Sequence, residues 1–111
     1  MSFNQYMQSI CETPVITREE ETALCDRIKQ GDETARHRLI ASNMRLVLKI
    51  ANEFKNLGTL ELEDIVSEGT IGLMQSIDRF DPSKAKFDTY AQYYIRLKIR
   101  RALDRSHAVH T

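Results

Sequence analysis

Residues 60–80 read LELEDIVSEGTIGLMQSIDRF, and this stretch decides the fold class. Its apolar residues recur at helical spacing, which predicts one long helix from about Leu60 to Arg79. The stripe on its buried side is expected to contain Leu62, Ile65, Val66, Leu73, Ile77 and Phe80. Gly69 and Gly72 fall inside this helix, where a glycine costs about 1 kcal/mol relative to alanine. We therefore expect another helix to cross closely at these glycines.

The residues before this stretch are also patterned as helices. A short first helix is predicted from the spacing of Phe3, Tyr6, Met7 and Ile10. Thr17 and Glu20 have the spacing of a capping box, so a second helix should begin there and end at Gly31. Asp32 can cap a third helix. We predict that this helix runs unbroken to Phe54. Its apolar side is made of Ala35, Leu39, Ile40, Leu46, Val47, Ile50, Ala51 and Phe54.

The residues after the central helix predict a turn and a final helix. A turn is expected at residues 81–84, because Pro82 biases Asp81 away from helical geometry. Asp88 or Thr89 can then cap a helix that runs to about Arg105. Its narrow buried stripe is Ala91, Ile95, Ile99 and Ala102. With no alternating strand pattern, the chain is predicted to be an all-α, compact bundle of four or five helices.

Composition excludes several classes of protein. A length of 111 residues fits one domain, and no apolar run approaches the length of a bilayer span. No secretory signal precedes the first helix, so a cytoplasmic location is expected. Cys11 and Cys25 have no partners at zinc-ligand spacing, and His107 and His110 lack a third ligand. No catalytic constellation is present, so we expect neither an enzyme nor a metal or other cofactor.

The charges are divided along the chain although their sum is zero. Residues 1–77 carry 8 Lys or Arg and 12 Asp or Glu, and residues 78–111 carry 8 and 4. The net charges are therefore −4 and +4. An acidic surface suits a basic protein partner, and a basic surface suits phosphate. The alternative is a solvated mosaic of charges with no functional meaning.

The segment from Phe87 to Arg105 carries the chemistry. Four of the eight aromatic residues lie within eight positions, and five cations follow within ten. Cations bind phosphates, and aromatic rings stack on unpaired bases with little dependence on base identity. A helix with both suits a protein that opens duplex DNA. The alternative is that the rings belong to the core and the cations form an exposed face, since aromatic side chains are mostly buried.

Several motifs in order resemble regions 1.2 and 2 of the sigma-70 family. They are the segments 16–21 (ITREEE), 39–40 and 42–47 (LI and SNMRLV), 64–74 (DIVSEGTIGLM), 80–82 (FDP), and 86–87, 89–91 and 93–96 (KF, TYA and YYIR). The resemblance implies residues 1–31 as a region 1.2-like part and residues 32–111 as a region 2-like part of one structural unit. It implies a transcription initiation factor. Such a factor would bind core RNA polymerase and melt the promoter −10 element by capturing flipped non-template bases.

The resemblance also implies which residues make these contacts. The clamp-helix coiled coil of the largest polymerase subunit would be gripped by Asp64, Ser67, Glu68 and Met74. Promoter DNA, as the single non-template strand of the −10 element, would be bound by Asn43, Phe80, Lys84, Lys86, Phe87, Thr89, Tyr90, Tyr93, Tyr94, Arg96, Arg100 and Arg101. Tyr90 matches the ring that stacks on the flipped adenine, and an anti-sigma protein is a further expected partner.

The sequence departs from the family pattern at several of these positions. Tyr93 and Tyr94 replace a pair of tryptophans, and Ser67 replaces a glutamine. Leu97 and Arg100 stand where housekeeping members have glutamine and threonine, and Ala85 stands where an aromatic residue is usual. Leucine cannot read a base edge, so an alternative-type factor with an altered −10 preference is expected.

A second function stays open. In it, the module would dock on polymerase or an anti-sigma protein without specific DNA recognition. The chain stops just past region 2, without the regions that reach the −35 element. We therefore expect either an excised domain or a truncated protein that selects promoters poorly.

Overall fold

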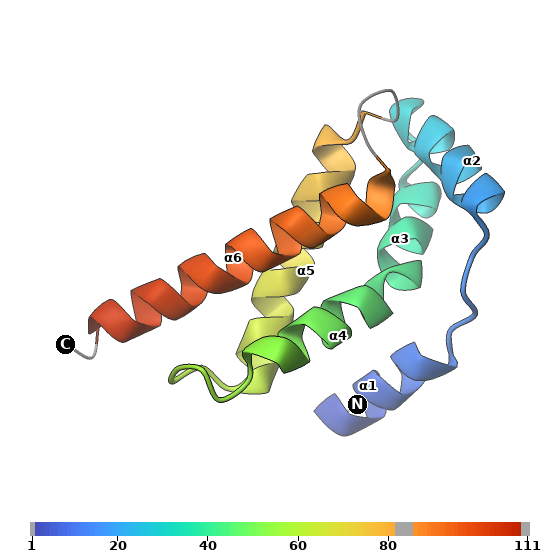
Figure 1. Ribbon diagram of the computed structural model, residues 1–111. Coiled ribbons are helices and arrows are strands. Elements are labelled where there is room, and N and C mark those ends of the chain that lie inside the picture. The colour runs from blue at the N-terminus through green and yellow to red at the C-terminus, as the bar shows by residue number, and fades with distance from the viewer. Residues whose placement is uncertain (1, 82–85, 110–111) are drawn as a thin grey trace. The chain divides into compact units, whose positions relative to one another are not determined.

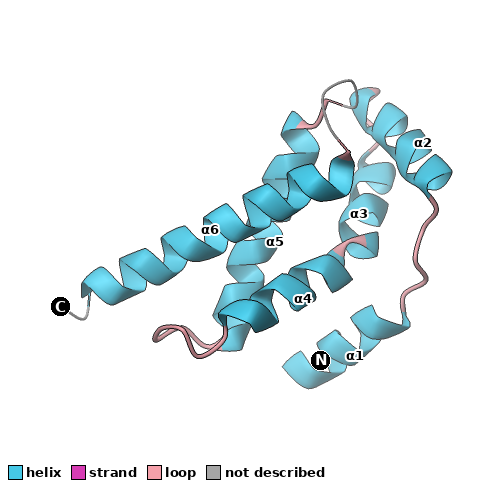
Figure 2. Cartoon of the chain, in the orientation of Figure 1, coloured by secondary structure: helices cyan, strands magenta, loops and turns pink. Residues whose placement is uncertain are grey.

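The computed structural model describes residues 2–81 and 86–109, with side chains up to residue 106 (Figure 1). Every regular element within these ranges is an α-helix, which confirms the all-α prediction (Figure 2). The helices are α1 (Phe3–Glu12), α2 (Arg18–Lys29), α3 (Glu33–Ser42), α4 (Met44–Phe54), α5 (Leu62–Arg79) and α6 (Phe87–Val109). They form two compact units whose boundary along the chain lies between Arg45 and Leu46. None of the described helices has both the length and the apolar character of a membrane span.

Reciprocal side-chain caps begin the first two helices. The predicted box at α2 is present: the Glu20 N–H donates to Thr17 Oγ1 at 3.1 Å, and the Thr17 N–H donates to Glu20 Oε1 at 3.5 Å. A second box, which was not predicted, joins Ser2 and Gln5 at the start of α1. Each box satisfies backbone N–H groups that have no partner inside the helix. These short sequence signals therefore fix where the two helices begin.

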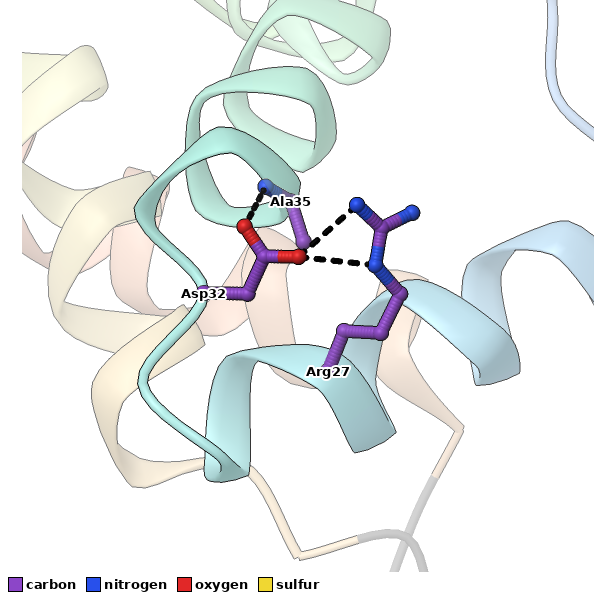
Figure 3. Close-up of polar contacts among 3 residues, drawn as sticks. All are labelled: Arg27, Asp32 and Ala35. Carbon is purple, nitrogen blue, oxygen red and sulfur yellow. Dashed lines mark hydrogen bonds and ion pairs between the residues drawn. The ribbon is translucent and has the colours of Figure 1, made fainter.

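The turn between α2 and α3 also follows its sequence signals. Gly31 has a φ of 89°, the left-handed conformation expected for a helix stop. Asp32 then caps α3, since its Oδ1 accepts from the Ala35 N–H at 3.2 Å (Figure 3). Its Oδ2 accepts from Arg27 Nε at 2.9 Å. The hydrogen bond from Arg27, and then that from Ala35, lowers the pKa of the Asp32 carboxyl below its ordinary value. Asp32 thus joins α2 and α3, which pack against each other.

The predicted unbroken helix from Asp32 to Phe54 is wrong, because the chain divides at Asn43 into α3 and α4. The Asn43 side chain donates from Nδ2 to the Leu39 carbonyl at 2.8 Å and to Ser42 Oγ at 3.4 Å. Its own N–H bonds to the Ile40 carbonyl at 3.1 Å, one residue nearer than α-helical geometry requires. Asparagine competes in this way with the helical ladder. The break adds a sixth helix to the four or five that were expected.

The second unit is built around the crossing of α5 and α6 (Figure 1). A Cβ atom on Gly72 would lie 2.5 Å from the carbonyl oxygen of Tyr94 and 2.9 Å from the Cα of Ile95. At Gly69, a Cβ would meet the side chains of Val47, Ile99 and Ile95 at 3.0–3.3 Å. The predicted close crossing at both glycines is confirmed. Only glycine lets the α5 backbone reach the α6 backbone at position 72.

Core residues line both sides of this crossing. The predicted buried stripe of α6 is confirmed, because Ala91, Ile95, Ile99 and Ala102 are all buried. The predicted caps of α6 are wrong: the helix begins at Phe87, and the Tyr90 N–H donates to the Lys86 carbonyl at 3.1 Å. The Asp88 carboxylate instead accepts from the next N–H, at 3.0 Å. The predicted turn at residues 81–84 lies outside the described residues except for Asp81.

Candidate nucleic-acid interface

Five rings make contact in sequence at the end of α5 and the start of α6, and we call them the aromatic row. They are Phe87, Phe80, Tyr90, Tyr94 and Tyr93. Successive ring centroids lie 5.1, 6.0, 5.1 and 5.4 Å apart, within the range of favourable aromatic pairs. Exposure rises along the row, from 2% at Phe87 to 62% at Tyr93. The row is therefore anchored in the core at one end and open to solvent at the other.

A polar network runs beside the middle of the row. The Tyr90 hydroxyl lies 3.3 Å from the carbonyl oxygen of Arg79 and 3.5 Å from the hydroxyl of Tyr94. The guanidinium carbon of Arg79 lies 5.9 Å from the centroid of the Tyr94 ring. The pKa of Tyr94 is lowered, first by the hydrogen bond from Tyr90 and then by Arg79. The pKa of Tyr90, the donor, is raised by the same hydrogen bond. These contacts link both rings to the last residue of α5.

The cations of α6 differ in how far they are engaged. Arg96 is paired with Glu53 of α4 through two hydrogen bonds, from Nη1 at 2.5 Å and from Nη2 at 3.4 Å. The hydrogen bond from Arg96 lowers the pKa of Glu53. Arg100 lies over the Phe54 ring at 5.7 Å from the centroid. Arg101 is exposed. A phosphate can thus approach Arg101 directly, whereas it must compete with a carboxylate at Arg96.

The remaining residues predicted to bind DNA lie in different places. Lys86 and Thr89 are exposed beside the aromatic row, at the start of α6. Lys84 lies outside the described residues. Asn43 belongs to the first unit, where its amide caps α3.

The residues predicted to bind polymerase share one helix. Asp64, Ser67 and Met74 are exposed on α5, and Glu68 is half-buried. Ile71 was not predicted as a contact; it is 43% exposed and lies between Ser67 and Met74 at spacings of four and three residues. An apolar residue at that spacing from two predicted contacts was the signal that could have found it. We call Asp64, Ser67, Ile71 and Met74 the α5 stripe.

An open groove of about 570 Å³ lies where the first half of α5 and the last half of α6 diverge. Its lining is Leu60, Asp64, Ser67, Glu68, Ala102, Arg105 and Ser106. Arg105 Nη2 and Glu68 Oε1 form an ion pair of 3.4 Å at this groove. Ser106 is hydrogen-bonded to Thr59, which precedes α5. Neither Glu53 nor Arg105 was predicted as a site residue, because their partners lie 43 and 37 residues away along the chain.

Comparison with known proteins identifies the family of the chain. The model of sigma-70 region 2 matches residues 39–108, and the model of sigma-70 factor region 1.2 matches residues 2–34. RNA polymerase sigma factor SigA of Clostridium acetobutylicum is 42% identical over 99 residues, which cover 88% of this chain and 26% of that protein. The chain thus spans about a quarter of this curated relative. Because the region 2 match alone covers more than half of the residues, the chain belongs to the sigma-70 factor family.

Proposed function

We propose that this chain is the part of a transcription initiation factor that docks on core RNA polymerase and captures displaced bases of the promoter −10 element. The α5 stripe would face the clamp-helix coiled coil of the largest subunit, and the aromatic row would face the non-template strand. Residues 1–31 would act as region 1.2, and residues 32–111 as region 2.

The observation that carries the proposal is the exposed end of the aromatic row. Tyr93 is 62% exposed, and Tyr90 and Tyr94 are half-buried, so three rings keep accessible surface. Stacking of a base on an accessible ring contributes about 1–3 kcal/mol. Lys86, which directly precedes α6, and Arg101 of α6 are exposed and can bind the adjoining phosphates. Phe87 is 2% exposed, so it would pack beneath the other rings in the core and would not contact a base itself.

The spacing of the α5 stripe supports docking on a coiled coil. Its members are separated by three, four and three residues, which is the spacing of a seam between packed helices. Its apolar members, Ile71 and Met74, are 43% and 38% exposed. The carboxylate of Asp64, at the other end of the stripe, and that of Glu68, which directly follows Ser67, suit a basic partner helix.

Replacement of Tyr93 by alanine tests the DNA-binding part. We expect Tyr93→Ala to weaken binding of a single-stranded −10 oligonucleotide by about 5- to 150-fold, because one stacking contact is lost. Fluorescence anisotropy measures the affinity, and circular dichroism checks the fold. The matched control is Tyr6→Ala, because Tyr6 is an exposed tyrosine of α1 outside the aromatic row. Unchanged affinity of a folded Tyr93→Ala variant would contradict this part of the proposal.

Charge reversal on α5 tests the docking part. We expect Glu68→Lys to abolish association with core RNA polymerase, because two like charges would then face each other at the interface. The control is Glu63→Lys, which changes an exposed carboxylate of the same helix that is not among the residues predicted to bind polymerase. Analytical size exclusion with purified core enzyme measures the complex. Equal loss in both variants would mean that the overall charge of α5 decides, and not the carboxylate of Glu68.

Two observations favour the second candidate, a docking module without specific DNA recognition. Arg96, expected to bind phosphate, is already paired with Glu53, and Leu97 offers no polar atom to a base edge. This candidate predicts that the chain binds polymerase or an anti-sigma protein. It also predicts no saturable, salt-sensitive binding of single-stranded DNA at low ionic strength.

A further inference from the structure

The open groove between α5 and α6 has one acidic wall and one basic wall. Asp64 and Glu68 line it from α5, and Arg105 lines it from α6. Leu60 and Ala102 add apolar surface to the same groove. The two walls therefore carry opposite charges beside an apolar area, within a single surface of the second unit.

Both walls continue beyond the groove. On α6, Lys98, Arg101 and Arg105 are separated by three and four residues, so they share one face of the helix. On α5, the α5 stripe leads from Asp64 to Ile71 and Met74, whose side chains are 43% and 38% exposed. The surface thus combines a row of cations, a pair of carboxylates and exposed apolar side chains.

The charges of this surface are only partly neutralised within the chain. Glu68 Oε1 and Arg105 Nη2 form the ion pair of 3.4 Å across the groove. Among the described residues, neither Asp64 nor Arg101 forms an ion pair or a side-chain hydrogen bond. Both are exposed. One carboxylate and one guanidinium group therefore remain available to a partner that carries both charges.

We propose that this partner is a second copy of the chain, bound through the groove as a symmetric dimer. In a twofold dimer every contact occurs twice, with the roles of the copies exchanged. A surface with adjacent acidic and basic walls is therefore complementary to itself. Asp64 of each copy would meet Arg101 of the other. Because the net charge of the chain is zero, no overall repulsion opposes this association.

The dimer would bury surfaces that have other proposed partners. Its contact includes part of the α5 stripe and the cations of α6, which the proposed function assigns to polymerase and to DNA. A chain in the dimer would therefore be unable to dock, and polymerase would have to displace the second copy. This consequence rests on the proposed function, whereas the dimer itself does not.

Sedimentation velocity of the chain alone tests the dimer. We expect a concentration-dependent dimer at low ionic strength that dissociates in high salt, because salt screens exposed charges. Asp64→Lys and Arg101→Glu should each weaken the dimer about tenfold or more, because like charges would then meet at both contacts. An equimolar mixture of the two variants should dimerise again. In the mixed dimer the introduced lysine faces the introduced glutamate, and the unchanged Asp64 and Arg101 form the other contact.

Matched controls separate the groove from the total charge. Glu63→Lys and Arg38→Glu make the same changes at exposed positions that do not line the groove, and they should leave the dimer intact. Circular dichroism checks the fold of each variant. A monomeric wild-type chain, equal weakening by the controls, or a mixture no more associated than its components would overturn the dimer. Each outcome leaves the binding of polymerase and DNA to be decided by its own measurements.

Discussion

Asp32 has two partners in the turn between α2 and α3, and pH can separate their contributions. Asp32→Asn keeps an oxygen that can accept from the Ala35 N–H but loses the charge that faces Arg27. Because the folded chain lowers the pKa of Asp32 below its ordinary value of 3.8, the charge stabilises the fold above that value. The stabilisation is lost as pH falls through the lowered pKa. Wild type should therefore exceed Asp32→Asn in Tm at neutral pH, with the difference disappearing in acid.

Thermal unfolding followed by circular dichroism from pH 7 to pH 2 measures this difference. Asp26→Asn is the control, because Asp26 is an exposed aspartate of α2 outside the capping contact. A Tm difference that stays constant or grows in acid would show that the charge of Asp32 does not act through Arg27.

At the scale of single residues, the sequence predicted the contacts that depend only on the spacing of neighbouring residues. Asp32 and Thr17 cap their helices as expected, since a cap needs only partners three residues away. The pairing of Arg96 with Glu53 could not be predicted in this way, because helical periodicity says which residues share a face but not which helix covers it. The graded exposure from Phe87 to Tyr93 likewise depends on where α5 ends against α6.

At the scale of elements, the crossing of α5 and α6 yields the clearest prediction about stability. Gly72→Ala should cost about 1–3 kcal/mol of unfolding free energy, because the new methyl group would overlap the Tyr94 carbonyl and one of the two backbones would have to shift. Gly69→Ala should be much milder. Its methyl group would meet only side-chain ends, and alanine gains about 1 kcal/mol in helix propensity.

Urea unfolding of the two variants measures the difference. Both replacements add the same methyl group to the same helix, so each is a control for the other. Equal unfolding free energies would mean that α6 can shift away from α5 at position 72.

The boundaries of two helices could not be predicted from the sequence. The apolar pattern continues across Asn43, so periodicity alone gave no reason for a break, yet the asparagine amide ends α3 there. At α6, two good capping residues were available, but the helix starts one residue before the first of them. Burial of the Phe87 side chain, which is 2% exposed, stabilises a helix that begins at that residue. This tertiary effect outweighs the stabilisation that a local cap would give.

At the scale of the whole molecule, opposite charges sit on the two helices that cross. α5 carries four carboxylates and one arginine, a net charge of −3, and α6 carries five cations and two carboxylates, a net charge of +3. The division of charge seen in the sequence at residues 77 and 78 therefore coincides with the end of α5. This arrangement predicts salt-sensitive DNA binding although the chain as a whole is neutral.

Arg101→Gln tests this electrostatic contribution. The salt slope for single-stranded DNA should fall by about 0.7, because one phosphate contact is lost, while the contribution of Tyr93 persists. Arg38→Gln removes an exposed arginine from α3 instead and should leave the slope unchanged. Titrations at several salt concentrations measure both slopes. An equal decrease in the two variants would indicate attraction to the total charge and not to the face of α6.

The glycine at position 72 has a mechanical consequence for any protein bound to α5. No side chain separates the backbones of α5 and α6 at that point. Because the two backbones meet directly there, we expect a tilt of α5 to move α6 with it. A protein bound to α5 could thus change the orientation of the rings at the start of α6 without touching any of them.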